Sequence, residues 1–219
     1  MMHDKTHWAH DTKHLHCAAP MSPAPRKGFP FMSSRLFPYS TQTPGTTPPD
    51  QQALNDTDSH WLRQAFVWAN AARLRGNRPF GAILVASDGR ILAEAFSNTR
   101  ETGDSTGHAE MNCIRQLGTA RLSPEVVAGA TLYASAEPCV MCAGAICGAG
   151  VRRVVFGVET ERLEHIRPDL RPITLSCHDV FAHSKAEVQC IGPCLVEEAL
   201  SVYEDSWLSP SANTSDPLF

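Results

Sequence analysis

The 219-residue sequence contains no run of eighteen consecutive apolar residues, so it predicts no membrane-spanning helix. It also lacks a large charge of either sign, because its formal net charge is −4. A mildly acidic chain is not built to coat nucleic acid, although a local basic patch remains compatible with this charge. The apolar share of 42% is that of a globular protein with a sizeable core, here expected as one domain with extensions.

A regular cysteine framework is also missing. Two of the eight cysteines form a C-x-x-C motif, and the other six are spread without a pattern (Cys17, Cys113, Cys147, Cys177, Cys190 and Cys194). Secreted proteins stabilised by disulfides show paired spacings instead. We therefore expect mostly free thiols, a reducing compartment and a cytoplasmic location.

Acidic residues are absent between Asp11 and Asp50, a stretch with no helical or strand periodicity. The first fifty residues hold half of the chain's sixteen prolines and five histidines (His3, His7, His10, His14 and His16). Such a segment buries too little apolar surface to offset the entropy lost when it is ordered. We expect residues 1–57 to form a disordered or flexible N-terminal extension.

Three other interpretations of this extension stay open. Its histidines could bind metal ions, although scattered histidines on such a segment usually bind weakly. The acid-poor stretch around residues 26–39 has the composition of an organelle import signal, but its prolines oppose an amphipathic helix. The third interpretation is a start codon assigned too early, with Met21 or Met32 as the true start.

The folded domain is expected over residues 58–207, followed by a tail at 208–219. Asp58 or Ser59 suits the N-cap of a first helix, in which tryptophans and alanines follow at helical spacing. Gly76 is of the type that follows a helix end. The helix is therefore predicted to lead directly into the first strand of the domain.

Two apolar segments, 79–86 and 90–97, lie on either side of Asp88-Gly89. This dipeptide between apolar runs is a strong signal for a hairpin turn. We expect two antiparallel strands, with Asn98 at the end of the second strand.

The rest of the domain alternates between helices and strands. After a loop at 99–107 we expect a helix with Met111, Ile114 and Leu117 on its buried face, a strand at 130–134, a helix at 139–147, a strand at 152–158, a helix at 159–166, a strand at 186–191 and a closing helix that starts at Pro193. Residues 167–185 show no clear pattern. The order αββαβαβαβα predicts a mixed sheet flanked by helices.

Two short motifs carry the chemistry, His108-Ala109-Glu110 and Pro138-Cys139-Val140-Met141-Cys142, each at the start of a predicted helix. An imidazole and two thiolates are ligands that zinc prefers, and three ligands leave one tetrahedral position open, as in catalytic sites. A helix N-terminus also favours the thiolate form of cysteine. His108, Cys139 and Cys142 are therefore the predicted ligands of a Zn2+ cofactor.

Glu110 is the predicted catalytic residue. Its carboxylate is placed to take a proton from a water molecule. The order H-x-E…P-C-x-x-C resembles the zinc deaminase signature, which implies that this carboxylate passes protons to a ring nitrogen and to a leaving amine, which departs as ammonia. No other acid or base lies near it in the sequence to share these transfers.

A structural zinc site is the alternative, and it would need a fourth protein ligand. Cys190 and Cys194, or Cys177 with His178, could supply that ligand. Neither pair has C-x-x-C spacing, and Cys190 falls inside a predicted strand. The catalytic interpretation is therefore favoured.

Together with Pro79-Phe80-Gly81-Ala82 and Thr131-Leu132-Tyr133, the two motifs resemble the cytidine-deaminase-like superfamily, and more narrowly its branch of guanine, cytosine and tRNA adenosine deaminases. The resemblance covers roughly residues 59–203. It implies an α/β fold, a three-layer α/β/α sandwich with a five-stranded mixed sheet. It also implies a homodimer in which the motif helices lie near the interface.

The predicted substrate-binding residues are Asn98, Phe80, Ala109 and Ser135. The resemblance implies the first two, and the backbone carbonyl near Ser135 is a candidate for orienting the base. Asn98 matches an asparagine at a strand end, and Phe80 matches a residue that lines the pocket, although it could simply belong to the core. Gly107 stands where the family more commonly has alanine.

Two substrate classes follow from the resemblance: a free nucleobase or nucleoside, or adenosine in a tRNA anticodon. The segments 140–145 and 152–157 are similar to the tRNA enzymes. Those enzymes typically grip the anticodon with a basic C-terminal helix, whereas this chain has no Lys or Arg after Lys185. The closing segment is acidic instead, which favours the small substrate. A non-catalytic partner subunit is disfavoured because Glu110 is present.

Overall fold

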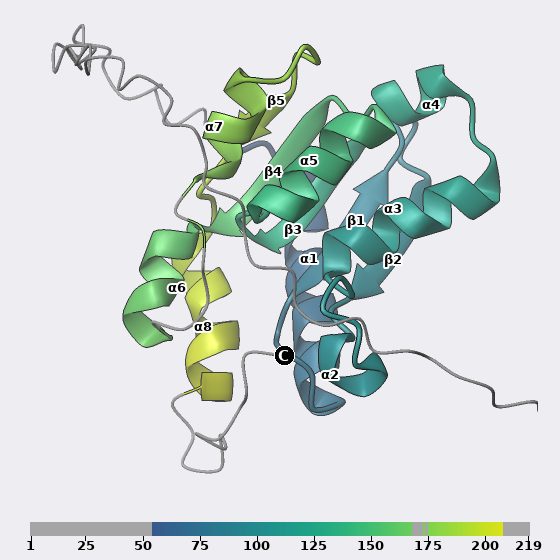
Figure 1. Ribbon diagram of the computed structural model, residues 1–219. Coiled ribbons are helices and arrows are strands. Elements are labelled where there is room, and N and C mark those ends of the chain that lie inside the picture. The colour runs from purple at the N-terminus through teal and green to yellow at the C-terminus, as the bar shows by residue number, and fades with distance from the viewer. Residues whose placement is uncertain (1–53, 168–172, 174, 208–219) are drawn as a thin grey trace, which may run out of the picture. The chain divides into compact units, whose positions relative to one another are not determined.

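The computed structural model describes residues 54–167, 173 and 175–207, with side chains up to residue 204 (Figure 1). The predictions for residues 1–53 and for the tail at 208–219 lie outside these residues. Within the described ranges, no helix has both the length and the apolar character needed to cross a membrane.

The core of the domain is a five-stranded mixed sheet in the order β2-β1-β3-β4-β5. Its strands are β1 (Gly81–Val85), β2 (Ile91–Phe96), β3 (Thr131–Ala136), β4 (Arg153–Val158) and β5 (Gln189–Ile191). β1 runs antiparallel to β2 and β3, whereas β3, β4 and β5 are parallel. The predicted mixed sheet of five strands is confirmed.

Helices cover both faces of this sheet, which gives the predicted α/β/α arrangement. One face packs against α1 (Asp56–Leu74), α6 (Thr160–Ile166) and α8 (Val196–Trp207); the other packs against α3 (Ala109–Ala120), α5 (Val140–Ala149) and α7 (Cys177–Ala182). Side chains alternate between the two faces, so that Ile83 packs towards α1 and Leu84 towards α3. Figure 1 shows α3 and α5 side by side on the same face of the sheet.

The N-cap of α1 is Asn55, not Asp58 or Ser59 as predicted. The side chain of Asn55 accepts a hydrogen bond of 2.8 Å from the backbone N–H of Asp58. Asp58 itself is only 4% exposed, and its carboxylate accepts hydrogen bonds from the two terminal guanidinium nitrogens of Arg153 at 2.7 and 2.8 Å. The hydroxyl of Tyr133 also donates to it at 2.7 Å. This carboxylate therefore fastens the start of α1 to two strands.

The closing helix α8 begins at Val196, so the prediction that Pro193 opens it was wrong. Pro193 follows a cis peptide bond after Gly192, and Leu195 has a positive φ of 51°. The chain therefore turns through these residues before the helical conformation starts. The buried residues of α8 include Ala199, Val202 and Tyr203.

Three short helices were missed by the sequence patterns. The predicted loop at 99–107 contains α2 (Thr99–Thr102), α4 (Pro124–Ala128) precedes β3, and α7 lies in the segment without a clear pattern. α7 starts with a capping box between Ser176 and Asp179. Helices of this length carry too few periodic positions for the apolar pattern to show them.

Candidate metal centre and catalytic site

The N-termini of the two motif helices, α3 and α5, lie close together and bring the predicted ligands to one site. His108 is the N-cap of α3 and Cys139 is the N-cap of α5, and both have extended backbone conformations. Cys142 is the third residue of α5 and is fully buried. β3 ends at Ala136, so Glu137 and Pro138 alone carry the chain from the sheet to Cys139. The ligand positions are thus fixed by the end of a strand and two helix starts.

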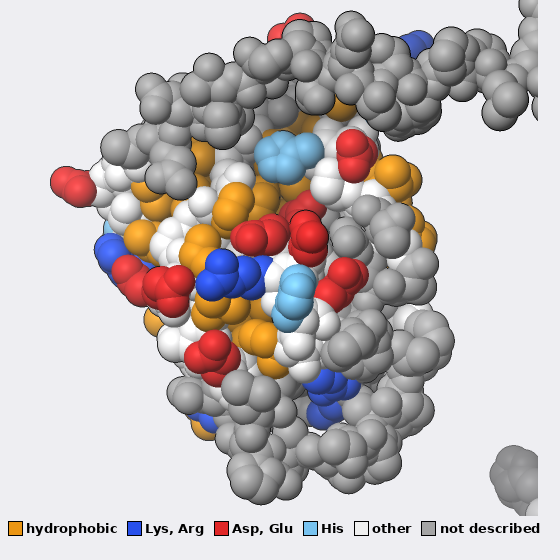
Figure 2. Space-filling model, turned by 90° about the vertical axis from the view of Figure 1, so that its left-hand side faces the viewer, with side chains coloured by type: hydrophobic (Ala, Val, Ile, Leu, Met, Phe, Trp, Pro, Cys, Tyr) orange, Lys and Arg blue, Asp and Glu red, His pale blue; other side chains and the backbone are white. Residues whose placement is uncertain are grey.

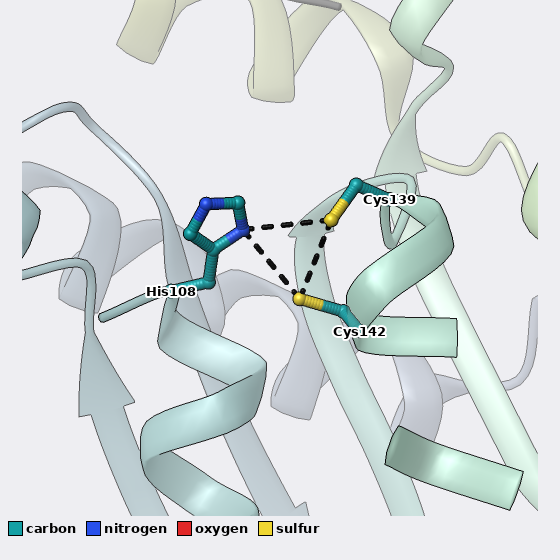
Figure 3. A group of neighbouring side chains, drawn as sticks. All are labelled: His108, Cys139 and Cys142. Carbon is teal, nitrogen blue, oxygen red and sulfur yellow. Dashed lines mark hydrogen bonds between the residues drawn. The ribbon is translucent and has the colours of Figure 1, made fainter. Parts of the chain in front are cut away.

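The three predicted ligands lie at distances that fit one zinc ion (Figure 3). Nδ1 of His108 is 3.5 Å from Sγ of Cys139 and 3.5 Å from Sγ of Cys142, and the two sulfurs are 3.6 Å apart. Tetrahedral zinc with bonds of about 2.3 Å to sulfur and about 2.0–2.1 Å to nitrogen places two sulfurs about 3.8 Å apart and a sulfur and a nitrogen about 3.6 Å apart. The three side chains therefore form a zinc-binding site.

The electrostatics of the two thiols suit a cation. The hydrogen bond between the sulfurs of Cys139 and Cys142 lowers the pKa of Cys139 to about 4, so this sulfur is a thiolate at neutral pH. The same hydrogen bond, together with burial, raises the pKa of Cys142, whose thiol donates to a carboxylate oxygen of Glu110. Binding of zinc between the two sulfurs would replace the remaining thiol proton and make both sulfurs thiolates.

Glu110 lies in the first turn of α3 and is only 8% exposed. One carboxylate oxygen is 3.6 Å from Sγ of Cys142, which places the carboxyl group directly beside the metal ligands. Burial, reinforced by the negative charge of Cys139, raises the pKa of Glu110 to about 7. A carboxyl group with such a pKa can both accept and donate a proton near neutral pH.

Zinc bound by His108, Cys139 and Cys142 would supply a Lewis acid that lowers the pKa of water from about 15.7 towards about 7.

Glu137 is a site residue that the sequence interpretation did not assign. One carboxylate oxygen accepts a hydrogen bond of 3.0 Å from the backbone N–H of Thr160, and the other accepts one of 2.8 Å from the N–H of Cys177. These donors belong to the starts of α6 and α7. Glu137 therefore anchors two helices to the turn that carries Cys139. Its place directly before Pro138-Cys139 was the available signal.

Asn98 lies where the second strand ends, as predicted, and its side chain is held in one orientation. Its Oδ1 accepts a hydrogen bond of 3.0 Å from Asn112, a residue of α3. Its backbone N–H donates to the carbonyl of Gly107 at 2.9 Å. Asn98 therefore lies against the residue that precedes His108, in a position from which a substrate contact stays a prediction.

Phe80 and Ser135 lie together under α8. The ring of Phe80 is 5.6 Å from that of Tyr203, and the Tyr203 hydroxyl donates to Oγ of Ser135 at 2.9 Å. Oγ of Ser135 also accepts a hydrogen bond from the N–H of Gly81 at 3.0 Å, and Ser135 is 1% exposed. The Ser135 hydroxyl thus already accepts two hydrogen bonds within the protein. The predicted contact of Ser135 with the substrate would therefore use its backbone.

Ala109 is fully buried in the core between the sheet and α3. It is the first residue of that helix, where backbone N–H groups have no partner within the helix itself. A contact with the substrate at this position would therefore use the main chain, and it stays a prediction.

A profile of the cytidine and deoxycytidylate deaminase zinc-binding region matches residues 55–158, which include the three ligands and Glu110. A probable cytosine deaminase of Schizosaccharomyces pombe is 31% identical over 157 residues, which cover 70% of this chain and 94% of that protein. A tRNA-specific adenosine deaminase of Agrobacterium fabrum is 44% identical over 128 residues, which cover 57% of this chain and 83% of that protein.

Solved structures show the same fold. A guanine deaminase from Nitrosomonas europaea is superimposed with a TM-score of 0.60 over 75% of this chain and 95% of that chain, at 21% sequence identity. At this identity the likeness concerns the architecture alone. It agrees with the mixed sheet and the helix layers described above.

Proposed function

This chain belongs to the cytidine and deoxycytidylate deaminase family of zinc-binding hydrolases, and we propose that its own substrate is a free nucleobase or nucleoside. In the proposed reaction, water replaces the exocyclic amine of the base and ammonia is released. The metal ligands are His108, Cys139 and Cys142, and Glu110 is the catalytic acid and base.

The observation that carries the choice of substrate is the acidic character of α8 beside the site. Tyr203 of this helix contacts Phe80 and Ser135, and burial together with the charge of Glu110 raises the pKa of Tyr203. The same helix exposes Glu197 and Glu198 to solvent. Because α8 contains no Lys or Arg, it offers a phosphate backbone no cationic contact, which supports an uncharged base as the substrate.

The arginines next to α8 do not reverse this charge. Arg63 forms a bidentate ion pair with Glu198 at 2.7 and 2.8 Å, and Arg162 lies 3.8 Å from Glu197. Figure 2 shows acidic side chains gathered on the side of the domain where α6, α7 and α8 lie. This side of the described domain offers no strongly basic surface for a phosphate backbone.

Glu110 performs the proton transfers of the proposed reaction. Its buried carboxylate first accepts a proton from the attacking water and then protonates a ring nitrogen of the base. In a second transfer, the remaining proton of the former water moves from the new hydroxyl group to the leaving amine, so that neutral ammonia departs. Burial of Glu110 excludes bulk water from these steps, which strengthens the interaction of the carboxylate with the developing charges.

The similarity to the S. pombe protein supports a small substrate. That likeness extends over 157 residues, against 128 for the A. fabrum enzyme, and it covers 94% of the protein named as a probable cytosine deaminase. This support comes from the length of the matched region, since the sequence identity is higher for the A. fabrum enzyme.

A tRNA anticodon is the second candidate substrate. Besides the 44% identity to a tRNA-specific adenosine deaminase, it is favoured by Arg78, whose positive charge acts on His108 from the segment between α1 and β1. A cation at this position could contact a phosphate next to a flipped-out base.

An ammonia-release assay separates the two candidates. The panel consists of guanine, cytosine, adenine, their nucleosides and an anticodon stem-loop, each tested with the wild type and with Glu110→Gln as the blank. We expect turnover of at least one base or nucleoside. Turnover of the stem-loop alone, lost in Arg78→Ala but kept in the control Arg90→Ala, would reject the small substrate.

We also propose that the chain forms a homodimer through α5. All ten residues of this outer helix, Val140–Ala149, are apolar, and Gly144 and Gly148 are exposed. An outer helix without polar side chains is unusual on a free surface and is typical of a protein interface.

A further inference from the structure

A second group of potential metal ligands lies outside the catalytic centre. Cys177, His178 and Cys190 each offer one ligand atom, and these atoms lie within 4.8 Å of one another. The sulfurs of Cys177 and Cys190 are 3.6 Å apart, the same separation as between the two cysteines of the catalytic centre. None of these residues takes part in the proposed deamination.

The fold brings this group together from two elements. Cys177 and His178 are the first two residues of α7, and Cys190 is the middle residue of β5, the edge strand of the sheet. Figure 1 shows α7 and β5 together at this edge. The capping box of Ser176 and Asp179 fixes the start of α7, and therefore the direction of the Cys177 and His178 side chains.

We propose that Cys177, His178 and Cys190 form a second metal site, which binds Zn2+ through two thiolates and one imidazole. The sulfur separation of 3.6 Å is close to the distance of about 3.8 Å between two sulfurs on tetrahedral zinc. Two sulfurs and a nitrogen are also a ligand set that selects zinc over magnesium or calcium.

Solvent supplies the fourth position of this site. Cys177 is fully buried, whereas His178 is exposed and Cys190 is half-buried. A depression of about 740 Å³ lies beside them and is lined by His178, Phe181, Gln189 and Cys190, among others. An ion held at the surface by three side chains can therefore keep a water molecule or accept an external ligand.

The second site would reach the catalytic centre through Glu137. The carboxylate of Glu137 accepts a hydrogen bond from the backbone N–H of Cys177. Glu137 itself lies two residues before the metal ligand Cys139. An ion bound by Cys177 and Cys190 also ties α7 to a strand of only three residues. The second metal would therefore hold the edge of the sheet and the catalytic turn in one arrangement, whichever substrate the enzyme uses.

Metal stoichiometry tests the proposal directly. The full chain is reduced, loaded with Zn2+, passed through a desalting column under anaerobic conditions and measured by elemental mass spectrometry. We expect two zinc ions per wild-type chain and one in each of Cys190→Ser and His178→Ala. Because His178 is exposed, its variant keeps the fold even if loss of a cysteine does not. Cys194→Ser is the matched control and should keep two ions.

The variant His108→Ala isolates the second site from the catalytic one. Loaded with Co2+, it should still show thiolate-to-cobalt charge-transfer absorption, and the double variant His108→Ala/Cys190→Ser should lose that band. One ion in the wild type, two ions retained in both His178→Ala and Cys190→Ser, or a Cys177–Cys190 disulfide that persists after reduction would each overturn the proposal. None of these outcomes depends on the identity of the deaminated substrate.

Discussion

Gly107 and Asn98 are in such close contact that a Cβ atom on Gly107 would overlap Oδ1 of Asn98. The glycine at position 107 therefore gives Asn98 room to lie against the residue before His108. Asn98 is then held by Asn112 and by the main chain of Gly107. The orientation of the predicted substrate contact therefore depends on the absence of one methyl group.

Gly107→Ala should displace the Asn98 side chain without disturbing the metal. We expect zinc content to stay unchanged and kcat/KM to fall about tenfold, the effect of losing one hydrogen bond of about 1.4 kcal/mol to the substrate. The control is Gly118→Ala on α3, where an added Cβ meets no neighbouring atom. An unchanged kcat/KM in Gly107→Ala would remove Asn98 from substrate binding.

Glu110→Gln should abolish proton transfer while it keeps the shape of the side chain. We expect kcat to fall about 10²–10⁴-fold, the usual contribution of general acid–base catalysis. Zinc content and thermal stability should stay close to those of the wild type, measured by elemental analysis and circular dichroism. Glu94→Gln, an exposed change on β2, serves as the control. Full activity in Glu110→Gln would assign the proton transfers to another residue.

Asp58→Asn should destabilise the fold, because it removes the charge that faces Arg153 and Tyr133. Loss of hydrogen bonds to a charged group costs about 1.5–3 kcal/mol of unfolding free energy, which denaturant titration can measure. The control is the exposed pair of Asp88 and Arg90: Asp88→Asn should lower the unfolding free energy much less than Asp58→Asn, because solvent screens this pair. Equal effects of the two changes would contradict the anchoring role of Asp58.

Asp58 also predicts how stability depends on pH. Burial alone would raise the pKa of Asp58, but hydrogen bonds from Arg153 and Tyr133 outweigh it, and the net pKa lies below the ordinary value of 3.8. A carboxyl group with a lowered pKa in the folded state stabilises the fold above its unfolded pKa. That stabilisation should be complete above about pH 5 and be lost as the pH falls below about 4. In Asp58→Asn this acid-induced loss should be smaller than in the wild type.

Gly144→Glu should break the proposed dimer. An added Cβ at Gly144 meets nothing within 4 Å, so the single chain accommodates a side chain there, whereas an interface across α5 does not. We expect light scattering after size exclusion to report a dimer for the wild type and a monomer for this variant. Gly118→Glu, equally open but on α3, should stay dimeric. A wild-type chain that is monomeric would reject the interface.

The sequence predicted the metal centre well because its information is local. The spacing of Cys139 and Cys142 within one helical turn and the position of His108 at a helix start determine most of the geometry. The order of the long elements followed from their apolar periodicity and from turn residues such as Asp88-Gly89. These signals each involve only a few neighbouring residues, so they can be recognised in the sequence before the fold is known.

The features that escaped prediction depend on contacts between distant segments. Asp58 was interpreted as a cap because its partner Arg153 lies 95 residues further along the chain. Cys177 and Cys190 were considered only as ligands of the catalytic zinc, since nothing in the sequence shows that α7 and β5 lie side by side. Pro193 suited a helix start, but the residues before Val196 are held by β4, because the backbone N–H of Cys194 donates to the carbonyls of Phe156 and Gly157.

Glu137 joins the matched family region to the two helices that follow it. The matched family region ends at residue 158, where β4 ends, and it holds the three metal ligands and Glu110, the predicted catalytic residue. α6 and α7, the next two helices, are fastened to this region by the two oxygens of one carboxylate. Exchange of the segment after β4 between related enzymes should therefore preserve the fold only where an acidic residue is kept at position 137.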